Sequence, residues 1–203
     1  MTIGQLINNK PITIDENASI KEVLDLMISN DVKRLLVVDV NQSLIGVIER
    51  KDICITMLRD LRDDVRAKDI VNREIITVDA ESDIGFVSKV MADQDLTFVV
   101  VLDTDDNIVS LITKTDIFKV LVELLGARHF GVRLTVELEE RPGALAQLLA
   151  ILSNEGANIV SLGTVSYELD KAIVTMKLQN IKKKTIEAVL GDKGTKILSI
   201  KDV

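Results

Sequence analysis

A hydroxyl and a carboxylate stand three residues apart where a strand is expected to end and a helix to begin. The segment reads Ser110-Leu-Ile-Thr-Lys-Thr-Asp116, with Thr113 closing the apolar run and Asp116 in the first helical turn. A carboxylate can accept two hydrogen bonds from a ribose diol, and a hydroxyl with N–H groups at a helix N-terminus can hold phosphate. The spacing suits a nucleoside monophosphate, although Thr113 and Asp116 would equally serve as helix caps.

A second segment has the same pattern but a different charge. It reads Gly46-Val-Ile-Glu-Arg-Lys-Asp52, so Glu49 stands where the other segment has a hydroxyl. A glutamate about 5 Å from a phosphate charge would repel it by about 3 kcal/mol at an effective dielectric of 20, more than one hydrogen bond contributes. We therefore expect the phosphate site at Asp116 and not at Asp52.

The residue types used most often for catalysis and metal binding are nearly absent. The chain has one histidine, His129, and one cysteine, Cys54, and neither belongs to a local cluster. Histidine is the common proton-transfer group near neutral pH and a common metal ligand. We therefore expect no enzyme activity, no metal and no bound cofactor.

Composition excludes several further classes of partner and location. The net charge of -7 disfavours a surface that binds DNA or RNA through many phosphate contacts. A lone cysteine cannot form an internal disulfide, no signal-peptide pattern opens the chain, and no apolar run approaches the ~18 to 20 residues of a membrane span. We expect a cytoplasmic protein that binds neither nucleic acid nor membrane.

The two chemical segments belong to an internal repeat. Residues 3–58 match residues 67–122 at a constant offset of 64, without a gap. Identical residues at this offset include Ile12 and Ile76, Thr13 and Thr77, Met27 and Met91, Asp39 and Asp103, and Asp52 and Asp116. Such a register predicts two copies of one structural unit, related by a pseudo-twofold axis and carrying equivalent pockets.

Apolar spacing predicts the same elements in each copy. After a short helical patch come an extended segment (11–14 or 75–78), a helix beginning near Ser19 or Ser82, two strands (35–39 and 44–48, or 98–102 and 108–112) and a closing helix. Residues 132–200 differ, with strands over 132–139, 158–165, 172–178 and 195–200 and helices over 144–154 and 183–190. This βαββαβ order is the ferredoxin-like plan, with an antiparallel sheet covered by both helices on one face.

Residues 1–125 resemble a pair of cystathionine-β-synthase (CBS) domains. The resemblance lies in the Ile-Thr strands, the Lys33-Arg-Leu-Leu-Val-Val-Asp39 strand with its counterpart at 96–103, and the closing glycine, hydroxyl and aspartate pattern. It implies an adenosyl ligand between the copies, such as AMP, ATP or S-adenosylmethionine. The implied contacts are Asp116 for ribose, Thr113 and Thr115 for phosphate, Ile76 and Thr77 for the base, and Arg34 for charge.

The first copy is implied to form a weaker site of the same kind. Its residues would be Ile12, Thr13 and Asp52, which we expect to stay empty or to accept an adenosyl group without phosphate. The second copy also departs from the family pattern, with Ser110 in place of glycine and Thr97-Phe98 in place of basic strand residues.

Residues 130–203 resemble an ACT domain, a regulatory module of amino-acid-controlled enzymes. The resemblance lies in Glu140-Arg-Pro-Gly143 before the first helix and Gly156-Ala-Asn-Ile159 at the second strand. It implies an amino-acid site made by Glu140, Arg141, Gly143 and Asn158. Gly143 would let the loop approach the ligand, and Asn158 could bond both of its polar ends. A tight turn without ligand binding remains the alternative.

A CBS pair followed by an ACT domain resembles the acetoin-utilisation AcuB-type proteins. The prediction is an α+β chain with CBS repeats over 1–62 and 63–126 and an ACT domain over 127–203. The resemblance implies a non-catalytic regulatory sensor, and we expect a homodimer because both modules present apolar faces to a second copy. The alternative is a ligand-free dimeric assembly or adaptor protein with degenerate sites.

Overall fold

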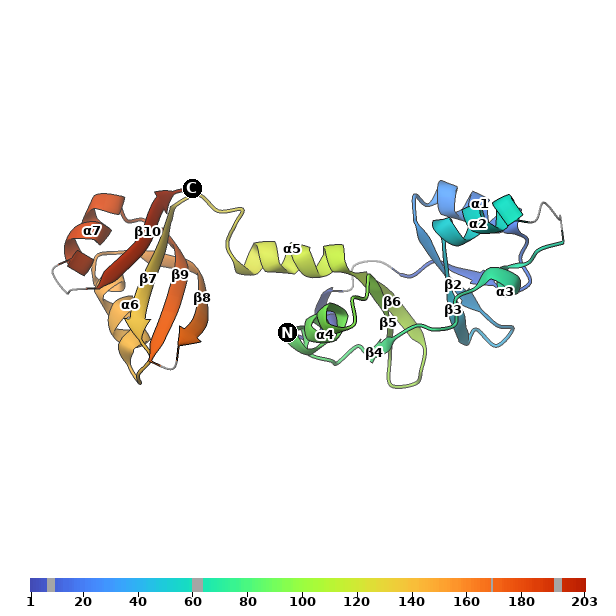
Figure 1. Cartoon of the computed structure of the whole chain (residues 1–203), viewed down its shortest axis with the longest axis horizontal. Coiled ribbons are helices and arrows are strands. Elements are labelled where there is room, and N and C mark those ends of the chain that lie inside the picture. The colour runs from blue at the N-terminus through green and yellow to red at the C-terminus, as the bar shows by residue number, and fades with distance from the viewer. Residues whose placement is uncertain (7–9, 60–63, 169, 192–194) are drawn as a thin grey trace. The chain divides into compact units, whose positions relative to one another are not determined.

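The computed structural model describes the chain except for residues 7–9, 60–63, 169 and 192–194 (Figure 1). The chain forms two compact units, residues 1–117 and 118–203. Each unit has its own sheets and its own buried core.

The first unit contains both repeats up to residue 117, which lies within the last helix of the second repeat. The first repeat comprises η1 (Ile3–Leu6), β1 (Thr13–Asp15), α1 (Ile20–Ser29), β2 (Arg34–Val38), β3 (Leu44–Glu49) and α2 (Arg50–Arg59). The second comprises α3 (Ala67–Ile70), β4 (Thr77–Asp79), α4 (Ile84–Asp93), β5 (Phe98–Leu102), β6 (Ile108–Thr113) and α5 (Lys114–Leu124). The sheets run β1-β2-β3 and β4-β5-β6, each with one parallel and one antiparallel pair. The repeat and its predicted element order are thereby confirmed.

Side-chain caps start the first long helix of each repeat. The Ser19 hydroxyl accepts the Glu22 N–H at 3.3 Å, and the Glu22 carboxylate accepts the Ser19 N–H at 2.7 Å. In the second repeat Asp83, one residue after Ser82, caps α4 by accepting the Gly85 N–H at 2.7 Å. These caps satisfy N–H groups that the helix itself leaves without acceptors.

The opening segment of each repeat packs on the other repeat. Ile3 is fully buried in the core of the second repeat, and its N–H donates to the Ser82 carbonyl at 2.9 Å. Ala67 is fully buried in the core of the first repeat, and its N–H donates to the Ala18 carbonyl at 2.9 Å. We call this reciprocal packing of η1 and α3 the arm exchange.

The two sheets share a third core cluster. Leu36, Val47 and Val100, from β2, β3 and β5, are buried together. Gly46 lies where the chain entering the second repeat crosses β3, and an added Cβ would come within 2.2 Å of the Asn72 carbonyl oxygen. The glycine predicted as part of a ligand pattern therefore has a packing reason in the first repeat, because this crossing leaves no room for a side chain.

The second unit has the predicted ferredoxin-like plan. It comprises β7 (Val132–Glu139), α6 (Ala144–Asn154), β8 (Asn158–Glu168), β9 (Lys171–Gln179), α7 (Lys183–Gly191) and β10 (Lys196–Asp202). The sheet order is β10-β7-β9-β8, and every neighbouring pair is antiparallel. Both helices cover one face (Figure 1), where Leu148 and Leu152 of α6 and Ile186 and Leu190 of α7 join the core.

A buried lysine lies on the other face of this sheet. Lys177 is 1% exposed, and its ammonium donates to the Val203 carbonyl oxygen at 3.1 Å. Arg133 lies directly opposite on β7 and donates to the Leu125 carbonyl at 3.0 Å. Burial, and secondarily the charge of Arg133, lowers the pKa of Lys177 below its ordinary value.

Candidate functional site

Thr113 and Asp116 meet where β6 ends and α5 begins. The Asp116 carboxylate accepts the Thr113 hydroxyl at 2.6 Å and the Thr113 N–H at 3.0 Å. The Asp116 N–H in turn donates to the Thr113 hydroxyl at 3.3 Å. The pair therefore has the geometry of a helix cap, and both side chains are half-buried. Thr115 lies on the same turn and is exposed.

The sheet brings the other predicted residues of the second repeat to the same end. Thr77 begins β4 and pairs with Val100 of β5, while the Ile76 carbonyl accepts the Val100 N–H at 3.0 Å. Thr113, at the end of β6, pairs with Phe98 at the start of β5. Adjacent strands lie ~4.8 Å apart, and β5 lies between β4 and β6, so Ile76 and Thr77 are about 10 Å from the end of β6. Ile76 is 36% exposed, so its side chain is accessible to a base.

Arg34 links the two repeats. Its Nη2 lies 2.9 Å from the Glu49 carboxylate, directly opposite it across β2 and β3, and 3.3 Å from the Thr97 hydroxyl of the second repeat. Its guanidinium carbon lies 4.8 Å from the centroid of the Phe98 ring, a cation–π geometry. The residue predicted to supply charge to the Asp116 site therefore reaches the second repeat while paired with Glu49.

Glu49 is held between two cations. Besides Arg34, the Lys51 ammonium lies 2.9 Å from its other carboxylate oxygen. Burial raises the pKa of Glu49, but the hydrogen bond from Lys51 and the charges of Arg34 and Lys51 outweigh burial, so the pKa lies below its ordinary value. The carboxylate is therefore charged at neutral pH.

The first repeat reproduces the cap at the predicted weaker site. The Asp52 carboxylate accepts the Glu49 N–H at 2.8 Å. Thr13 begins β1, and the carbonyl of Ile12 accepts the Leu36 N–H at 3.1 Å. The backbone framework matches that around Asp116, and the Glu49 carboxylate takes the place of the Thr113 hydroxyl.

The four predicted amino-acid contacts do not form one cluster within a chain. Glu140, Arg141 and Gly143 follow the end of β7, where Gly143 adopts the left-handed φ of 85°. Asn158 begins β8 and pairs with Gln179, at the end of the sheet where β7 starts. At ~3.3 Å per residue, the length of β7 separates the two groups by about 23 Å. The structure keeps Glu140, Arg141 and Gly143 together and places Asn158 apart.

One of these residues, Arg141, lines a cavity of about 530 Å³. The Arg141 guanidinium lies 3.0 Å from the Glu139 carboxylate and donates to the Gln147 amide oxygen at 3.1 Å. The remaining lining residues are Glu137, Leu138, Ala144, Leu148, Ile151, Lys171, Thr195 and Lys196. They come from β7, α6, β9 and the start of β10, so no local pattern could have grouped residues 137–151 with Lys171 and Lys196.

A larger hollow of about 800 Å³ lies at the other end of this sheet, lined by Phe130, Lys182–Lys184 and Val203 among others. None of the predicted site residues lines it.

The described part of the chain contains neither a metal-binding cluster nor a membrane-spanning helix. Its histidine, cysteine, aspartate and glutamate side chains form no group of three that could hold a metal ion. Among its helices, none combines the length and apolar character needed to cross a membrane.

Known families match most of the chain. The CBS domain matches residues 3–59 and 67–123, and the TTHA0829-like ACT domain matches residues 130–201. Both matches agree with the division into a repeated first part and a ferredoxin-like second part.

Curated relatives match part of the chain. A homoserine O-acetyltransferase of Methanocorpusculum labreanum is 26% identical over 113 residues, covering 56% of this chain and 23% of the relative. The protein MJ0450 of Methanocaldococcus jannaschii is 32% identical over 124 residues, covering 59% of this chain and 66% of the relative. The chain spans 23% of the length of the acetyltransferase and 36% of the length of another relative, the protein MJ1232 of Methanocaldococcus jannaschii.

Solved structures share the fold. The CBS domain pair of MJ0100, in complex with 5′-methylthioadenosine and S-adenosyl-L-methionine, has a TM-score of 0.53 at 23% identity, covering 64% of this chain and 98% of that one. PAE2072 of Pyrobaculum aerophilum, complexed with AMP, has a TM-score of 0.52 at 22% identity, covering 57% and 89%.

A third structure comes from the AcuB-type proteins that the sequence resembles. The putative acetoin utilization protein AcuB of Vibrio cholerae has a TM-score of 0.56 at 17% identity, covering 63% of this chain and 95% of that one. With both repeats and the C-terminal part matched by known families, this chain belongs to the CBS-domain family, as a tandem CBS pair followed by a TTHA0829-like ACT domain.

Proposed function

We propose that the chain is a non-catalytic regulatory sensor whose CBS pair binds an AMP-like adenosyl ligand at the Asp116 site. The observation that carries this proposal is the hydrogen-bonded pair of Thr113 and Asp116 at the start of α5, at the same sheet end as Ile76 and Thr77. The AMP and S-adenosylmethionine complexes of proteins with a similar fold support an adenosyl ligand.

The chemistry of ligand binding follows from exchanging hydrogen bonds at this cap. A ribose diol would donate to the Asp116 carboxylate in place of the Thr113 hydroxyl. The released hydroxyl would then donate to phosphate, which the N-terminus of α5 also favours. Thr115, exposed on the same turn, would be a further phosphate donor.

Regulation would work through the contact between repeats. Arg34 belongs to the first repeat and touches Thr97 and Phe98 of the second, so a ligand at Asp116 would change contacts in both. A ligand that binds one arrangement of the repeats better than another shifts the population toward it.

Calorimetry with AMP, ATP and S-adenosylmethionine tests the proposal. Asp116→Ala should weaken AMP binding by about 10-fold to 100-fold, since hydrogen bonds to a charged group contribute about 1.5–3 kcal/mol. Asp52→Ala is the matched control because it removes the equivalent cap and should leave AMP affinity near that of the unmodified chain. Absence of binding by all three ligands, or full binding by Asp116→Ala, would refute the proposal.

We further propose an amino acid as ligand of the cavity around Arg141. Arg141 could bind its carboxylate, Glu137 or Glu139 its ammonium group, and Leu148 an apolar side chain. A thermal-shift panel of amino acids, repeated with Arg141→Gln, tests this site. A shift that survives Arg141→Gln would place the ligand elsewhere.

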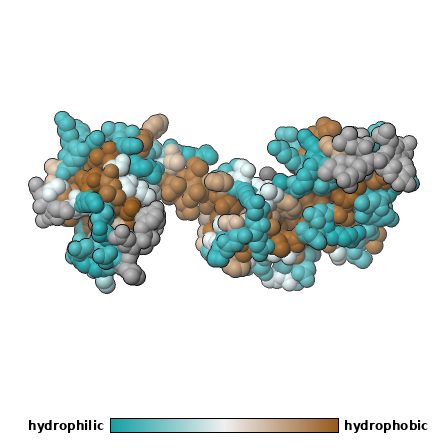
Figure 2. Space-filling view, viewed as in Figure 1, coloured by the Kyte–Doolittle hydropathy of each residue, from teal (hydrophilic) through white to brown (hydrophobic). Residues whose placement is uncertain are grey.

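We propose that the protein works as a homodimer. Large apolar side chains are exposed on α5 (Figure 2), where Phe118 is 64% exposed and Leu124 is 61% exposed. Light scattering on the purified protein should give a molar mass about twice that of one chain. A molar mass of one chain at high protein concentration would refute the proposal.

The second candidate function is a ligand-free adaptor. It is favoured by the pairing already present at both sites, Thr113 with Asp116 and Arg34 with Glu49. It predicts no thermal shift with any nucleotide or amino acid and a stable complex with a partner protein.

A further inference from the structure

We propose that Glu49 competes with the ligand phosphate for the guanidinium of Arg34. The first repeat would then set how strongly the Asp116 site prefers a phosphorylated adenosyl ligand over adenosine. This inference rests on the proposed function of the Asp116 site. It gives Glu49 a role at the site of the other repeat, beyond excluding phosphate from its own.

Arg34 lies close enough to the Asp116 site to serve it. Its guanidinium carbon is 4.8 Å from the centroid of Phe98, which pairs directly with Thr113 across β5 and β6. Side chains that face each other across an antiparallel pair have Cβ atoms about 5 Å apart. The cation is therefore one side chain away from the hydroxyl expected to hold phosphate.

The guanidinium has a donor that its present partners do not use. Its Nη2 donates to Thr97 at 3.3 Å and lies 2.9 Å from Glu49. Its Nε is buried and has no acceptor among the residues that the structure describes. A buried donor without an acceptor is unfavourable, and a phosphate can accept from two neighbouring N–H groups of one guanidinium. Because the second oxygen of Glu49 is paired with Lys51, the present arrangement leaves this N–H for a further oxyanion such as phosphate.

Across the two repeats, Arg34 is the one arginine available at this position for two anions, the Glu49 carboxylate and the phosphate expected at Asp116. Arg34 in the first repeat corresponds to Phe98 in the second at the offset of 64, so the second repeat has no cation of its own there. Lys51, the other cation on Glu49, is 69% exposed, whereas Arg34 is 21% exposed. Exposed ion pairs contribute little, and Arg34 is the less exposed and more tightly held of the two cations on Glu49. A phosphate that takes Arg34 must therefore do so against Glu49.

The test compares AMP with adenosine in the full chain by calorimetry. Glu49→Gln should raise AMP affinity about 10-fold and change adenosine affinity less than twofold, because only the phosphate meets the guanidinium. Arg34→Gln should weaken AMP selectively, and in that background Glu49→Gln should no longer change the AMP-to-adenosine ratio, which makes a double-mutant cycle.

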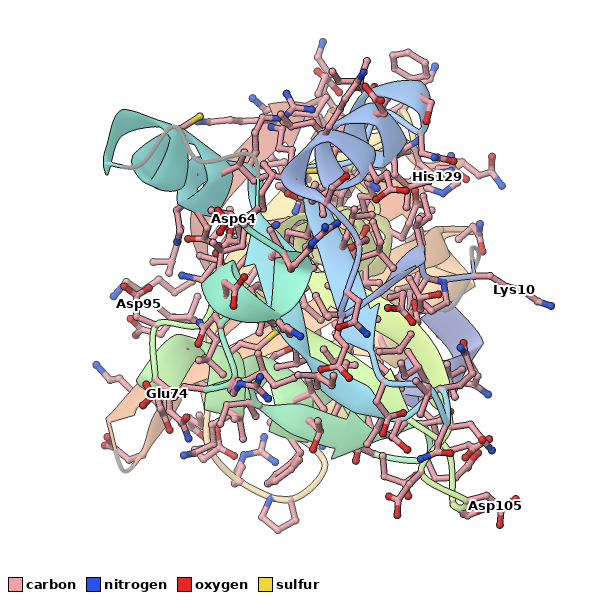
Figure 3. The ribbon with its side chains drawn as sticks, turned by 90° about the vertical axis from the view of Figure 1, so that its right-hand side faces the viewer. Lys10, Asp64, Glu74, Asp95, Asp105 and His129 are labelled. Atoms are coloured by element: carbon pink, nitrogen blue, oxygen red, sulfur yellow. The ribbon has the colours of Figure 1, made fainter. Side chains whose placement is uncertain are left out.

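Asp105→Asn is the control for net charge. Asp105, labelled in Figure 3, is exposed in the turn between β5 and β6, at the opposite end of these strands from Phe98 and Thr113. This variant changes the net charge by the same amount as Glu49→Gln and should leave the ratio unchanged.

The outcomes separate this inference from the function on which it rests. If neither AMP nor adenosine binds the unmodified chain, both proposals are overturned. If both bind, and Glu49→Gln leaves the ratio unchanged or lowers it, this inference alone is overturned. Glu49→Thr, which copies residue 113, is a second variant that should raise the ratio, so the test does not depend on the folding of one variant.

Discussion

Arg34 and Glu49 show how a single pair of residues can join two structural copies. The two side chains face each other across β2 and β3, and the same guanidinium packs on Phe98 of the second repeat. From the sequence, Arg34 was predicted as a cation for one site and Glu49 as a repulsive charge at the other. Both expectations concern the same ion pair, because the start of β2 and the end of β3 meet at the open end of one hairpin.

Acid should weaken the contribution of Glu49 to folding. Its pKa is lowered from the ordinary value of 4.5, so its charge stabilises the fold above that pH and the benefit is lost as pH falls through the folded value. Glu49→Gln should cost about 1 kcal/mol at pH 7, as expected of a partly exposed ion pair. The difference between the two proteins should shrink below pH 4.5 in urea unfolding. A difference that stays constant down to pH 3 would contradict the charge assignment.

Lys177 should destabilise the second unit at neutral pH. Its lowered pKa means that the unfolded chain holds the proton more tightly, so stability rises as pH increases from the folded value toward 10.5. Lys177→Met keeps the buried aliphatic length and should stabilise by about 1 kcal/mol, or about 4–8 °C in Tm for a domain of this size.

Lys201→Met is the matched control, because Lys201 also lies opposite Arg133 but is exposed. It should leave Tm nearly unchanged. A loss of stability in Lys177→Met would show that the hydrogen bond to the Val203 carbonyl outweighs the cost of burying the charge.

Among the elements, the short η1 segment has an effect larger than its length. Ile3 is fully buried, and its neighbours in the core, including Val87 and Met91, belong to the other repeat. Periodicity predicted a helical patch here but could not assign its partner, because the contact joins residues about 80 positions apart in sequence.

Ile3→Ala should therefore destabilise the second repeat. Removing a buried isoleucine side chain costs about 2–5 kcal/mol. Chemical unfolding measures the loss, and amide exchange should show faster opening around Met91 and Val99, which share this core. Ile28→Ala, at a position that is 69% exposed, is the control and should change stability by less than about 0.5 kcal/mol. Equal losses in the two variants would contradict the arm exchange.

Sequence patterns located helices and strands directly, but they did not contain the spacing between residues that the fold brings to one sheet. The strand predicted over 98–102 and the helix predicted over 144–154 have the bounds that the structure shows. A continuous run of β-branched and aliphatic residues marks the strand, and apolar residues at helical spacing mark the helix. The predicted amino-acid-binding residues were grouped by resemblance to the ACT family. The antiparallel register places one of them, Asn158, at the end of the sheet opposite Arg141 and Gly143. Register depends on strand order, which local patterns do not contain.

For the whole molecule, the arm exchange predicts that the two repeats unfold together. Each core includes a residue from the other repeat, so neither can open without exposing part of its partner. Calorimetry should show one transition for both repeats, and AMP at 100 times its Kd should stabilise that transition by about 2.7 kcal/mol. A scan in which one repeat melts separately, with AMP moving only that step, would contradict this coupling.

The arm exchange also bears on the origin of such a chain. A lone repeat would leave open the recess that Ile3 or Ala67 fills, and the arm of an identical neighbour could fill it. Gene duplication turns that neighbour into a permanent part of the same polypeptide. Each half is then encoded by its own stretch of the gene, so its residues can diverge from those of the other half. One such difference is the pair of Glu49 and Arg34 in the first half, which corresponds to Thr113 and Phe98 in the second.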